Sequence, residues 1–438
     1  MYHYFVRLGV IQHTVEANQM DSLESAIESA GARLIERLAV MRRISQRNDW
    51  IERILFSPAS EEAAYKLKSW MNAAGMNTIY DPLTNVYGQI VFSEEGSQAP
   101  RIHLGSHYDT VVNAGAFDGI LGVLIGIAVV EAIVESNEPF NHNLSVLAFS
   151  DEEGVRFNTT FLGSAYLSGQ FDEAWLHKED EYGKTLGEWL VDRAESIDII
   201  LGAHRTPYIR PQDFFLEAHI EQGPILEDSN RALGVFTRIA AQLRSEIILK
   251  GCAGHAGTIP ASLRKDPLPV ASEMILAVNA LCRSDERIRA TVGQLEILPN
   301  ASNVIPGQVR FSIDMRHPDK EGLNKAHNKL TQDIQTIAKR SELEFQYKLV
   351  HQAQDAQLDE KLTDALSESC EVLQGASIRM FSGAGHDSMK IAQVCPVSML
   401  AVRCKDGLSH HPEEFASNAD CLLAFKAMLR TVLAIDKN

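Results

Sequence analysis

Two apolar runs that end in polar residues stand out in the sequence. Residues 100–107 read Pro-Arg-Ile-His-Leu-Gly-Ser-His, and residues 144–151 read Leu-Ser-Val-Leu-Ala-Phe-Ser-Asp. We interpret each run as a strand, with an apolar helix over residues 119–135 between them. Strands that alternate with helices predict a layered α/β domain, and open sheets of this kind place ligand sites at the carboxyl ends of their strands.

The chain predicts two domains, because 438 residues exceed the usual size of a single hydrophobic core. From Ala232 the expected element order is β-α-β-β-α-β, a complete ferredoxin-like unit. Its expected elements are strand 239–250, helix 266–280, strand 290–297, strand 308–314, helix 322–340 and strand 344–350. We therefore expect a first domain over residues 21–231 and 352–438, interrupted by an inserted domain over residues 232–351. The remaining expected elements of the first domain are helix 21–48, strands 78–80 and 86–92, and helix 419–435.

Composition and charge argue against several classes of partner. The chain has 41 Lys+Arg and 58 Asp+Glu, a net charge of −17, whereas a nucleic-acid surface needs clustered cations. The longest apolar run, residues 120–130, is too short to span a bilayer, and the N-terminus lacks the order of a signal peptide. Six cysteines without a C-x-x-C pair favour a reduced, cytoplasmic protein. Met20 precedes a natural helix start, so residues 1–19 are expected to be dispensable.

Histidine and carboxylate side chains follow the expected strands in the pattern of a two-metal site. Imidazole and carboxylate are ligands that hold Zn²⁺ or Mn²⁺. His107 is a candidate ligand, and Asp109 is expected to accept a hydrogen bond from its other ring nitrogen. The two oxygens of Asp118 could bridge two cations about 3.5 Å apart. Glu152 and Glu153 point in different directions after a strand, so one can face metal while the other faces substrate.

Each of these segments also has an ordinary structural interpretation. His107 could end a capped strand, Asp118 could serve only as a helix cap, and two acids after a strand often form a solvated turn. Taken singly, His219, His386 or His410 would more often be structural than a ligand. Together, these three residues supply the imidazoles that a two-metal site still needs.

Eight ordered motifs carry a resemblance that covers the chain from about Leu23 to the C-terminus. They are His-x-Asp-Thr-Val-Val, Phe-Asp-Gly, Phe-Ser-Asp-Glu-Glu-Gly-Val-Arg-Phe, His-Ile-Glu-Gln-Gly-Pro, Gly-His-Ala-Gly-Thr, Asn-Val-Ile-Pro-Gly-Gln-Val, Gly-Ala-Gly-His-Asp and Gly-Leu-Ser-His. This set resembles the amidase/hydantoinase/carbamoylase family, a branch of the dinuclear metallopeptidase superfamily. Within it, residues 149–163 and 402–405 look most like allantoate amidohydrolases.

The resemblance implies a centre of two divalent cations, Mn²⁺ or Zn²⁺, in a zinc-peptidase-like α/β domain. The implied ligands are His107, Asp118 and His219 for one cation, and Asp118, Glu153 and His410 for the other. Glu152 would act as general base and then acid, with Asp109 as its catalytic neighbour. His410 is preferred over His411 because it matches the Ser-His pair of the family.

The resemblance also implies how substrate is held. Residues 232–351 resemble the dimerisation or lid domain of the family, so a homodimer is expected. The implied substrate-binding positions are Gln222, His255, Asn303, Arg316 and His386. Arg316 would grip a substrate carboxylate, because a planar guanidinium suits a two-oxygen acceptor. His255 would stabilise the negative oxygen that forms as water adds to the ureido carbon.

The implied reaction is hydrolysis of a ureido C–N bond, and the favoured substrate is allantoate, which yields ureidoglycine, CO₂ and ammonia in purine catabolism. N-carbamoyl-L-amino acids, N-carbamoyl-β-alanine and ureidoglycolate remain as alternatives, and a peptidase, an aminoacylase or a non-catalytic metal scaffold is more distant. Residues 401–404 read Ala-Val-Arg-Cys where many carbamoylases carry a Phe-Val-Pro-Ser-like stretch, which favours the allantoate branch by analogy. The chain has no G-x-S-x-G and no phosphate loop, so neither a serine hydrolase nor a nucleotide cofactor is indicated.

Overall fold

A computed structural model describes residues 2–137, 139–193, 202, 205 and 207–437. The chain divides into two compact units. The first comprises Met1–Thr237, Leu358–Met380 and His386–Asn438, and the second comprises Arg238–Gln357 and Phe381–Gly385. The boundaries expected at 232 and 352 lie shortly before the observed ones, and the short segment 381–385 lies outside the expected insertion.

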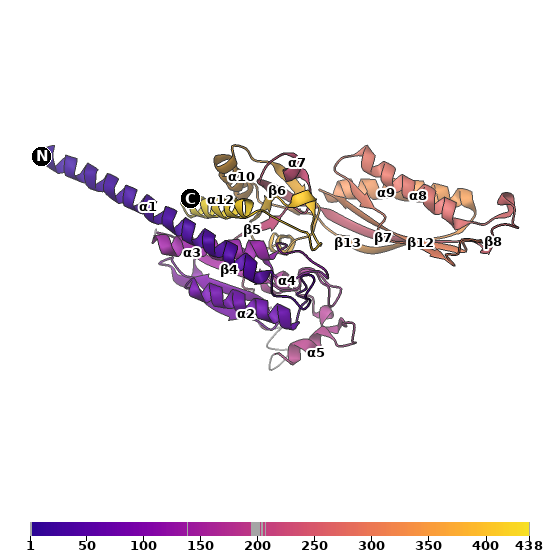
Figure 1. Cartoon of the computed structure of the whole chain (residues 1–438), viewed down its shortest axis with the longest axis horizontal. Helices are drawn as coiled ribbons and strands as arrows, with labels where there is room; N and C mark the ends of the chain where they lie inside the picture. Colours follow the sequence, from indigo (N-terminus) through magenta and orange to yellow (C-terminus); the bar gives the residue numbers. More distant parts are fainter. Residues whose placement is uncertain (1, 138, 194–201, 203–204, 206, 438) are drawn as a thin grey trace. The chain divides into compact units, whose positions relative to one another are not determined.

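A nine-stranded mixed sheet forms the centre of the first unit (Figure 1). Its strands are β1 (Asn77–Tyr80), β2 (Val86–Ile90), β3 (Arg101–His107), β4 (Asn143–Phe149), β5 (Phe214–Ile220), β6 (Leu233–Ile239), β14 (Ala356–Gln357), β15 (Arg379–Ser382) and β16 (Val397–Val402). The order is β1-β2-β4-β3-β5-β16-β6-β14, with β15 also paired to β6. The neighbours β4, β3, β5 and β16 are parallel, so their carboxyl ends lie at one edge.

Helices alternate with these strands, which confirms the α/β class. They are α1 (Tyr2–Met41), α2 (Pro58–Ala73), α3 (Ile120–Ser136), α4 (Leu162–Leu167), α5 (Leu186–Val191), α7 (Ile225–Asp228), α10 (Glu360–Gln374), α11 (Ser388–Ile391) and α12 (Asn418–Asp436). The helix expected over 21–48 is wrong at both ends, because α1 already begins at Tyr2 and ends at Met41. No interruption occurs at the expected start, because residues 21 and 22 lie within the helix.

The core of the first unit forms where α3 packs on the parallel strands. Helix α3 is buried along almost its whole length and contacts β3, β4 and β5. Gly122 allows this close approach, because a Cβ at that position would lie 2.1 Å from the carbonyl oxygen of Ala218 in β5. The start of α3, which follows Asp118, is therefore held firmly against the strand that carries His219.

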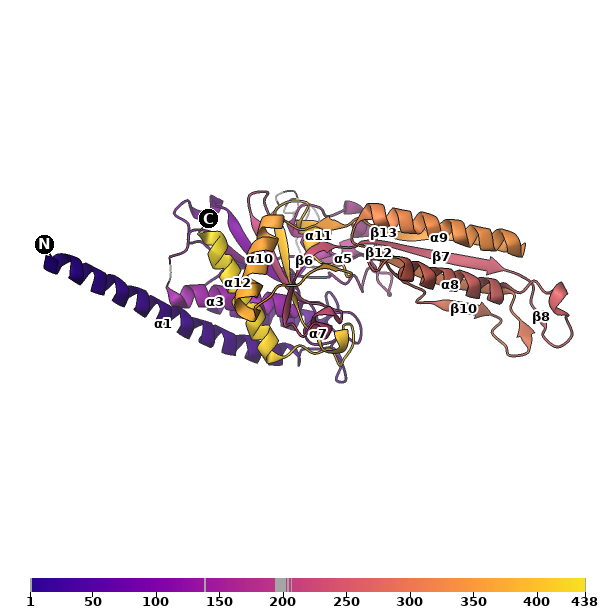
Figure 2. The same ribbon diagram turned by 90° about the horizontal axis from the view of Figure 1, so that it is seen from above.

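The second unit has the element order expected from the sequence. Its elements are β7 (Ala241–Lys250), α8 (Pro267–Ser284), β9 (Arg289–Thr291), β10 (Leu295–Leu298), β12 (Gln308–His317), α9 (Lys320–Ser341) and β13 (Glu344–Ala353). The sheet order is β10-β12-β7-β13, and Figures 1 and 2 show α8 and α9 together on one face of it. The single strand expected over 290–297 is wrong, because β9 and β10 pair separately with β12 on either side of Gly293. A small pair, β8 (Gly254–His255) and β11 (Val304–Ile305), completes the unit.

Membrane insertion finds no support among the described helices. The most apolar, α3, has 17 residues and is covered by other elements of the first unit. Within the described ranges, no helix combines the length and the hydropathy that crossing a bilayer requires.

Candidate metal centre

His107 and His219 meet because their strands are parallel neighbours. His107 is the last residue of β3, and His219 lies next to the last residue of β5. Pairing of Leu104 with Leu216 places the carboxyl ends of both strands at the same edge. The two Nε2 atoms are 3.5 Å apart, and both side chains are buried. Each Nδ1 lies within hydrogen-bond distance of a backbone carbonyl, of Asp109 at 3.1 Å and of Ile220 at 2.9 Å, which directs both Nε2 atoms inward.

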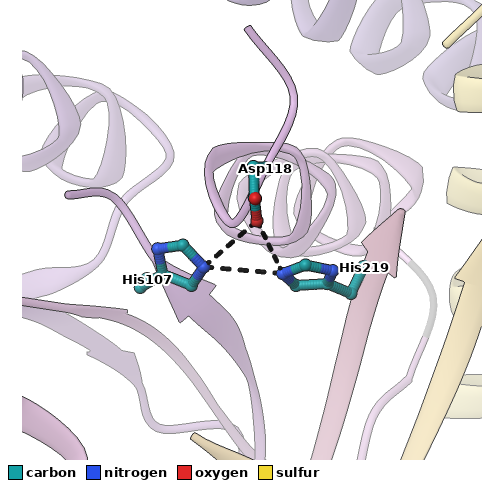
Figure 3. Close-up of side chains that lie close together, drawn as sticks. All are labelled: His107, Asp118 and His219. Carbon is teal, nitrogen blue, oxygen red and sulfur yellow. Dashed lines mark hydrogen bonds and ion pairs between the residues drawn. The ribbon is translucent and has the colours of Figure 1, made fainter. Parts of the chain in front are cut away.

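Asp118 places one oxygen against each half of the site. It precedes α3, and its Oδ1 lies 3.1 Å from Nε2 of His219 and 3.4 Å from Nε2 of His107. Figure 3 shows the carboxylate and the two imidazoles pointing toward one another. The second oxygen of Asp118, Oδ2, faces the other way and lies 3.2 Å from Nε2 of His410. A carboxylate whose two oxygens face different groups of candidate ligands has the geometry of a ligand that bridges two metal ions.

Glu153 and His410 complete the second half of the site. Nε2 of His410 lies 3.2 Å from Oε1 of Glu153 and, as described above, the same distance from Asp118. His410 adopts a left-handed backbone conformation (φ 55°), and 47% of its side chain is exposed. The structure places His410 at the carboxylates, whereas Nδ1 of His411 accepts a hydrogen bond from the backbone of Glu413. The half-exposed imidazole marks the solvent side of the centre.

Three groups of ligand atoms therefore overlap in one cluster. They are His107, Asp118 and His219; Asp118, Glu153 and His410; and His107, Glu152 and Glu153, each with its ligand atoms within 4.8 Å of one another. The first two groups match the ligand sets expected from the sequence and share Asp118. The third brings Glu152 to the same cluster from the turn after β4.

Comparison with known proteins identifies the family. Residues 103–434 match the sequence profile of Peptidase family M20/M25/M40. The chain belongs to this family. It is 36% identical over 403 residues to an N-carbamoyl-L-amino-acid amidohydrolase from Pseudomonas sp. (strain NS671), which covers 91% of this chain and 96% of that protein. It is 34% identical over 426 residues to allantoate deiminase 1 of Glycine max, with 90% and 87% covered.

A solved structure supports the same assignment. An amidase of the hydantoinase/carbamoylase family from Burkholderia multivorans superposes with a TM-score of 0.86 at 32% identity. The match covers 93% of this chain and 98% of that structure. The resemblance that the eight motifs carry is thus confirmed, and so is the expected fold class of this M20/M25/M40 member.

The centre of this M20/M25/M40 protein buries more negative than positive charge. Burial raises the pKa of Asp109 to about 6 and the pKa of Glu414 to about 7, and it raises the pKa of Glu152 well above the usual range. Burial also acts on Asp118, but the imidazoles of His107, His219 and His410 around it lower its pKa well below the ordinary value. The buried cation nearby, Arg53, donates to backbone carbonyls.

This excess of buried carboxylates fits divalent cations. Buried charges are costly unless they are paired or coordinate a metal. Oδ1 of Asp118 is buried and has no hydrogen-bond partner among the described residues, although the Nε2 atoms of His107 and His219 surround it. An oxygen that faces imidazole nitrogens without a hydrogen bond is suited to a metal ion between them. The donor set of imidazole and carboxylate accordingly suits Zn²⁺ or Mn²⁺.

Asp109 lies beside His107 in a different way from the one expected. Its carboxylate oxygen lies 3.7 Å from Nδ1, beyond a hydrogen bond, and its backbone carbonyl faces that nitrogen instead. The carboxylate accepts hydrogen bonds from the backbone N–H groups of Glu152 at 3.1 Å and Glu153 at 3.2 Å. The expected hydrogen bond to His107 is therefore wrong, because the turn after β4 supplies better-placed donors. Asp109 orients the two glutamates.

The structure places the expected substrate-binding residues in both units. Gln222 donates from Nε2 to Asp118 at 3.1 Å, and His386 packs against His219 with ring centroids 4.5 Å apart. In the second unit, Arg316 binds the carboxylate of Asp314 and donates to the carbonyl of Gly383 at 2.7 Å. The other two, His255 and Asn303, are exposed residues of the β8 and β11 region of that unit.

Sequence reasoning missed a second layer of buried polar groups behind the ligands. Glu217 is fully buried and accepts hydrogen bonds from the hydroxyls of Ser106 at 2.8 Å and Ser388 at 2.6 Å. Glu414 accepts hydrogen bonds from the backbone just before α3, and its Oε2 lies 3.1 Å from the hydroxyl of Ser409. The sequence shows two adjacent glutamates at 413–414, close to His410, but it does not show which of the two is buried.

Proposed function

We propose that this chain is a metal-dependent hydrolase of a ureido C–N bond. The observation that carries the proposal is the pair of ligand groups that share Asp118, with Glu152 in the same cluster. Support comes from relatives named N-carbamoyl-L-amino-acid amidohydrolase and allantoate deiminase. The alignments with this chain cover 96% and 87% of the lengths of these two relatives. In this proposal His107, Asp118 and His219 hold one cation, and Asp118, Glu153 and His410 hold the other.

Each protein group then has a chemical task. Two divalent cations, when bound, lower the pKa of a coordinated water toward neutrality and polarise the carbonyl of the substrate. Glu152 takes a proton as water adds to the ureido carbon, and it later gives that proton to the leaving nitrogen. Asp109 keeps Glu152 and Glu153 in place through their backbone N–H groups. Glu152 is itself buried, with 7% of the residue exposed.

Allantoate is the first substrate in this proposal. Water and allantoate would give ureidoglycine, CO₂ and ammonia, which balances atoms without any oxidant or nucleotide. Arg316 would bind the substrate carboxylate and His255 would stabilise the developing negative oxygen. Asn303, His386 and Gln222 are the further proposed substrate-binding residues. An N-carbamoyl-L-amino acid is the second candidate, favoured by the 36% identity to a Pseudomonas enzyme of that name.

The finer properties follow the same reasoning. We propose Mn²⁺ or Zn²⁺ as the metals, because the ligands are three imidazoles and two carboxylates. We also propose a homodimer through the domain expected over residues 232–351 and a cytoplasmic location, in keeping with six free cysteines.

A substrate panel tests the function. Chelated, Mn²⁺-loaded and Zn²⁺-loaded enzyme would be incubated with allantoate, ureidoglycolate, N-carbamoyl-L-amino acids, N-carbamoyl-β-alanine and a dipeptide, and ammonia and free amine would be measured. We expect ammonia from allantoate in a metal-loaded sample and none after chelation. Release of amino acids from the dipeptide, without ammonia from any ureido compound, would refute the proposal.

A further inference from the structure

Glu414 is a buried carboxylate that touches the segment carrying Asp118. Only 2% of the residue is exposed. Its Oε1 accepts hydrogen bonds from the backbone N–H groups of Phe117 at 2.8 Å and Asp118 at 3.0 Å. These two donors belong to the residues just before α3 and lie outside the hydrogen bonds of the helix. One oxygen of Glu414 therefore fixes the backbone from which the shared carboxylate projects.

The second oxygen of Glu414 reaches the side chain of Asp118 through a serine. Oε2 lies 3.1 Å from the hydroxyl of Ser409, and the same hydroxyl lies 2.9 Å from Oδ2 of Asp118. Gln222 also donates to Oδ2, at 3.1 Å, and to Ser409 at the same distance. Gln222 thus donates to the oxygen of Asp118 that faces His410, and the hydroxyl of Ser409 lies between that oxygen and Oε2 of Glu414, with one proton that it can donate to one of the two carboxylates.

Glu414 also joins two segments that are far apart in the sequence. Phe117 and Glu414 are separated by 297 positions, and Ser409 and His410 lie in the loop that leads to Glu414. The contact is close, because a Cβ added to Gly115 would lie 2.3 Å from Cβ of Glu414. The start of α3, which positions Asp118, is thereby tied to the loop that supplies His410.

We propose that Glu414 is a positioning residue that holds Asp118 in its bridging geometry between the two cation sites. The inference rests on the proposed function, since it assumes that Asp118 is shared by two cations. A residue that only capped the backbone of Phe117 and Asp118 would not need a carboxylate. Burying the carboxylate of Glu414 beside other carboxylates is costly. The buried position of Glu414 is explained if its carboxylate also restrains the metal ligand Asp118, because hydrogen-bond partners of metal ligands commonly have this role.

Metal affinity, measured apart from activity, tests this role. Wild-type protein and the variants Glu414→Ala, Glu414→Gln and Ser409→Ala would be stripped with chelator and titrated with Mn²⁺ by calorimetry. Bound metal would be counted by mass spectrometry. Glu413→Ala is the matched control, because Glu413 is the exposed neighbour of Glu414. Thermal melting of the chelated proteins reports folding separately.

We expect Glu414→Ala to raise the Mn²⁺ dissociation constant about 10–100-fold, in the range seen when a hydrogen-bond partner of a metal ligand is removed. Glu414→Gln keeps an oxygen for the two backbone donors, so its loss should be smaller than that of the alanine variant. Ser409→Ala should fall between Glu414→Ala and wild type. Glu413→Ala should bind Mn²⁺ as wild type does.

The outcomes separate this inference from the proposed function. If wild type binds two ions and Glu414→Ala binds them with unchanged affinity, the inference is wrong and the function stands. If wild type binds no Mn²⁺, nor Zn²⁺ in a parallel titration, the proposed function fails as well. If Glu414→Ala does not fold, the Mn²⁺ affinities of Glu414→Gln and Ser409→Ala decide. Wild-type affinity in both variants would overturn the inference.

Discussion

Glu152 and Glu153 are neighbouring carboxylates with different proposed roles. They are adjacent in sequence, and both have their backbone N–H groups held by Asp109. Glu153 contacts His410, whereas Glu152 is buried and groups with His107 and Glu153. Because successive side chains after a strand diverge, one glutamate can bind a cation while the other remains free for a proton.

This division predicts distinct effects for the two isosteric amides. Glu152→Gln should retain its metal and lose turnover by about 10²–10⁴-fold, because a general base is removed while the ligands remain. Steady-state kinetics with the best substrate of the panel, together with metal counting, measure both effects.

Glu153→Gln serves as the comparison, because it removes a proposed ligand and should lose metal. A Glu152→Gln protein with full metal content and full turnover would show that Glu152 carries no proton in the reaction.

At the scale of elements, the packing of α3 on β5 determines the distance between Asp118 and His219. Gly122 lies one turn into α3 and faces the backbone of Ala218, one residue before His219. Gly126, one turn further along α3, faces the side chains of Leu104 and Val146 instead. The two glycines therefore differ in how closely the neighbour approaches: an added Cβ would lie 2.1 Å from a backbone oxygen at Gly122, but 3.1 Å from Cβ of Leu104 at Gly126.

We expect Gly122→Ala to be clearly more destabilising than Gly126→Ala. An added Cβ at Gly122 lies 2.1 Å from a carbonyl oxygen, whereas at Gly126 the nearest atom is 3.1 Å away. Both substitutions gain about 1 kcal/mol of helix propensity, so the difference between them reports overpacking, which costs about 1–3 kcal/mol.

Urea unfolding of the two variants measures this difference in the free energy of unfolding. Equal stability of the two would mean that the close contact between α3 and β5 does not constrain the site.

At the scale of the whole molecule, the charge of the centre links metal binding to stability. The chain has a net charge of −17, and several carboxylates of the first unit are buried around one cluster. In the absence of cations these groups are costly to keep charged, because burial, and to a smaller extent neighbouring carboxylates, raises the pKa of Asp109 to about 6 and the pKa of Glu414 to about 7. Cations that bind only the folded chain would relieve this cost.

Chelation should therefore lower the melting temperature of the intact protein. A metal present at 100 times its dissociation constant adds about 2.7 kcal/mol to the stability of the folded state. Differential scanning fluorimetry in chelator and in Mn²⁺ or Zn²⁺ measures the shift, with Asp118→Asn as the variant in which the added metal should have little effect. Identical melting temperatures of wild type in both conditions would contradict a stabilising metal centre.

The elements next to His107 and Asp118 were predicted most closely. The strand expected to end at His107 does so, and the helix expected over 119–135 is α3 (Ile120–Ser136). Strand β5, which carries His219, was not predicted, nor were β6, β15, β16 and α10. The four strands are short apolar runs, which are compatible with either a buried strand or a buried helix, so their pattern alone does not distinguish them. Helix α10 is amphipathic and its helical spacing could have been recognised.

The sequence alone determined the residue types of the centre, because imidazole and carboxylate chemistry and the family motifs can be recognised without coordinates. Only the tertiary structure decided how those groups meet. His107 and His219, 112 positions apart, converge because β3 and β5 are parallel neighbours. Glu414 faces Phe117 and Asp118 because the chain returns to the start of α3 almost 300 positions later. Such contacts depend on strand order and packing, which local sequence patterns do not encode.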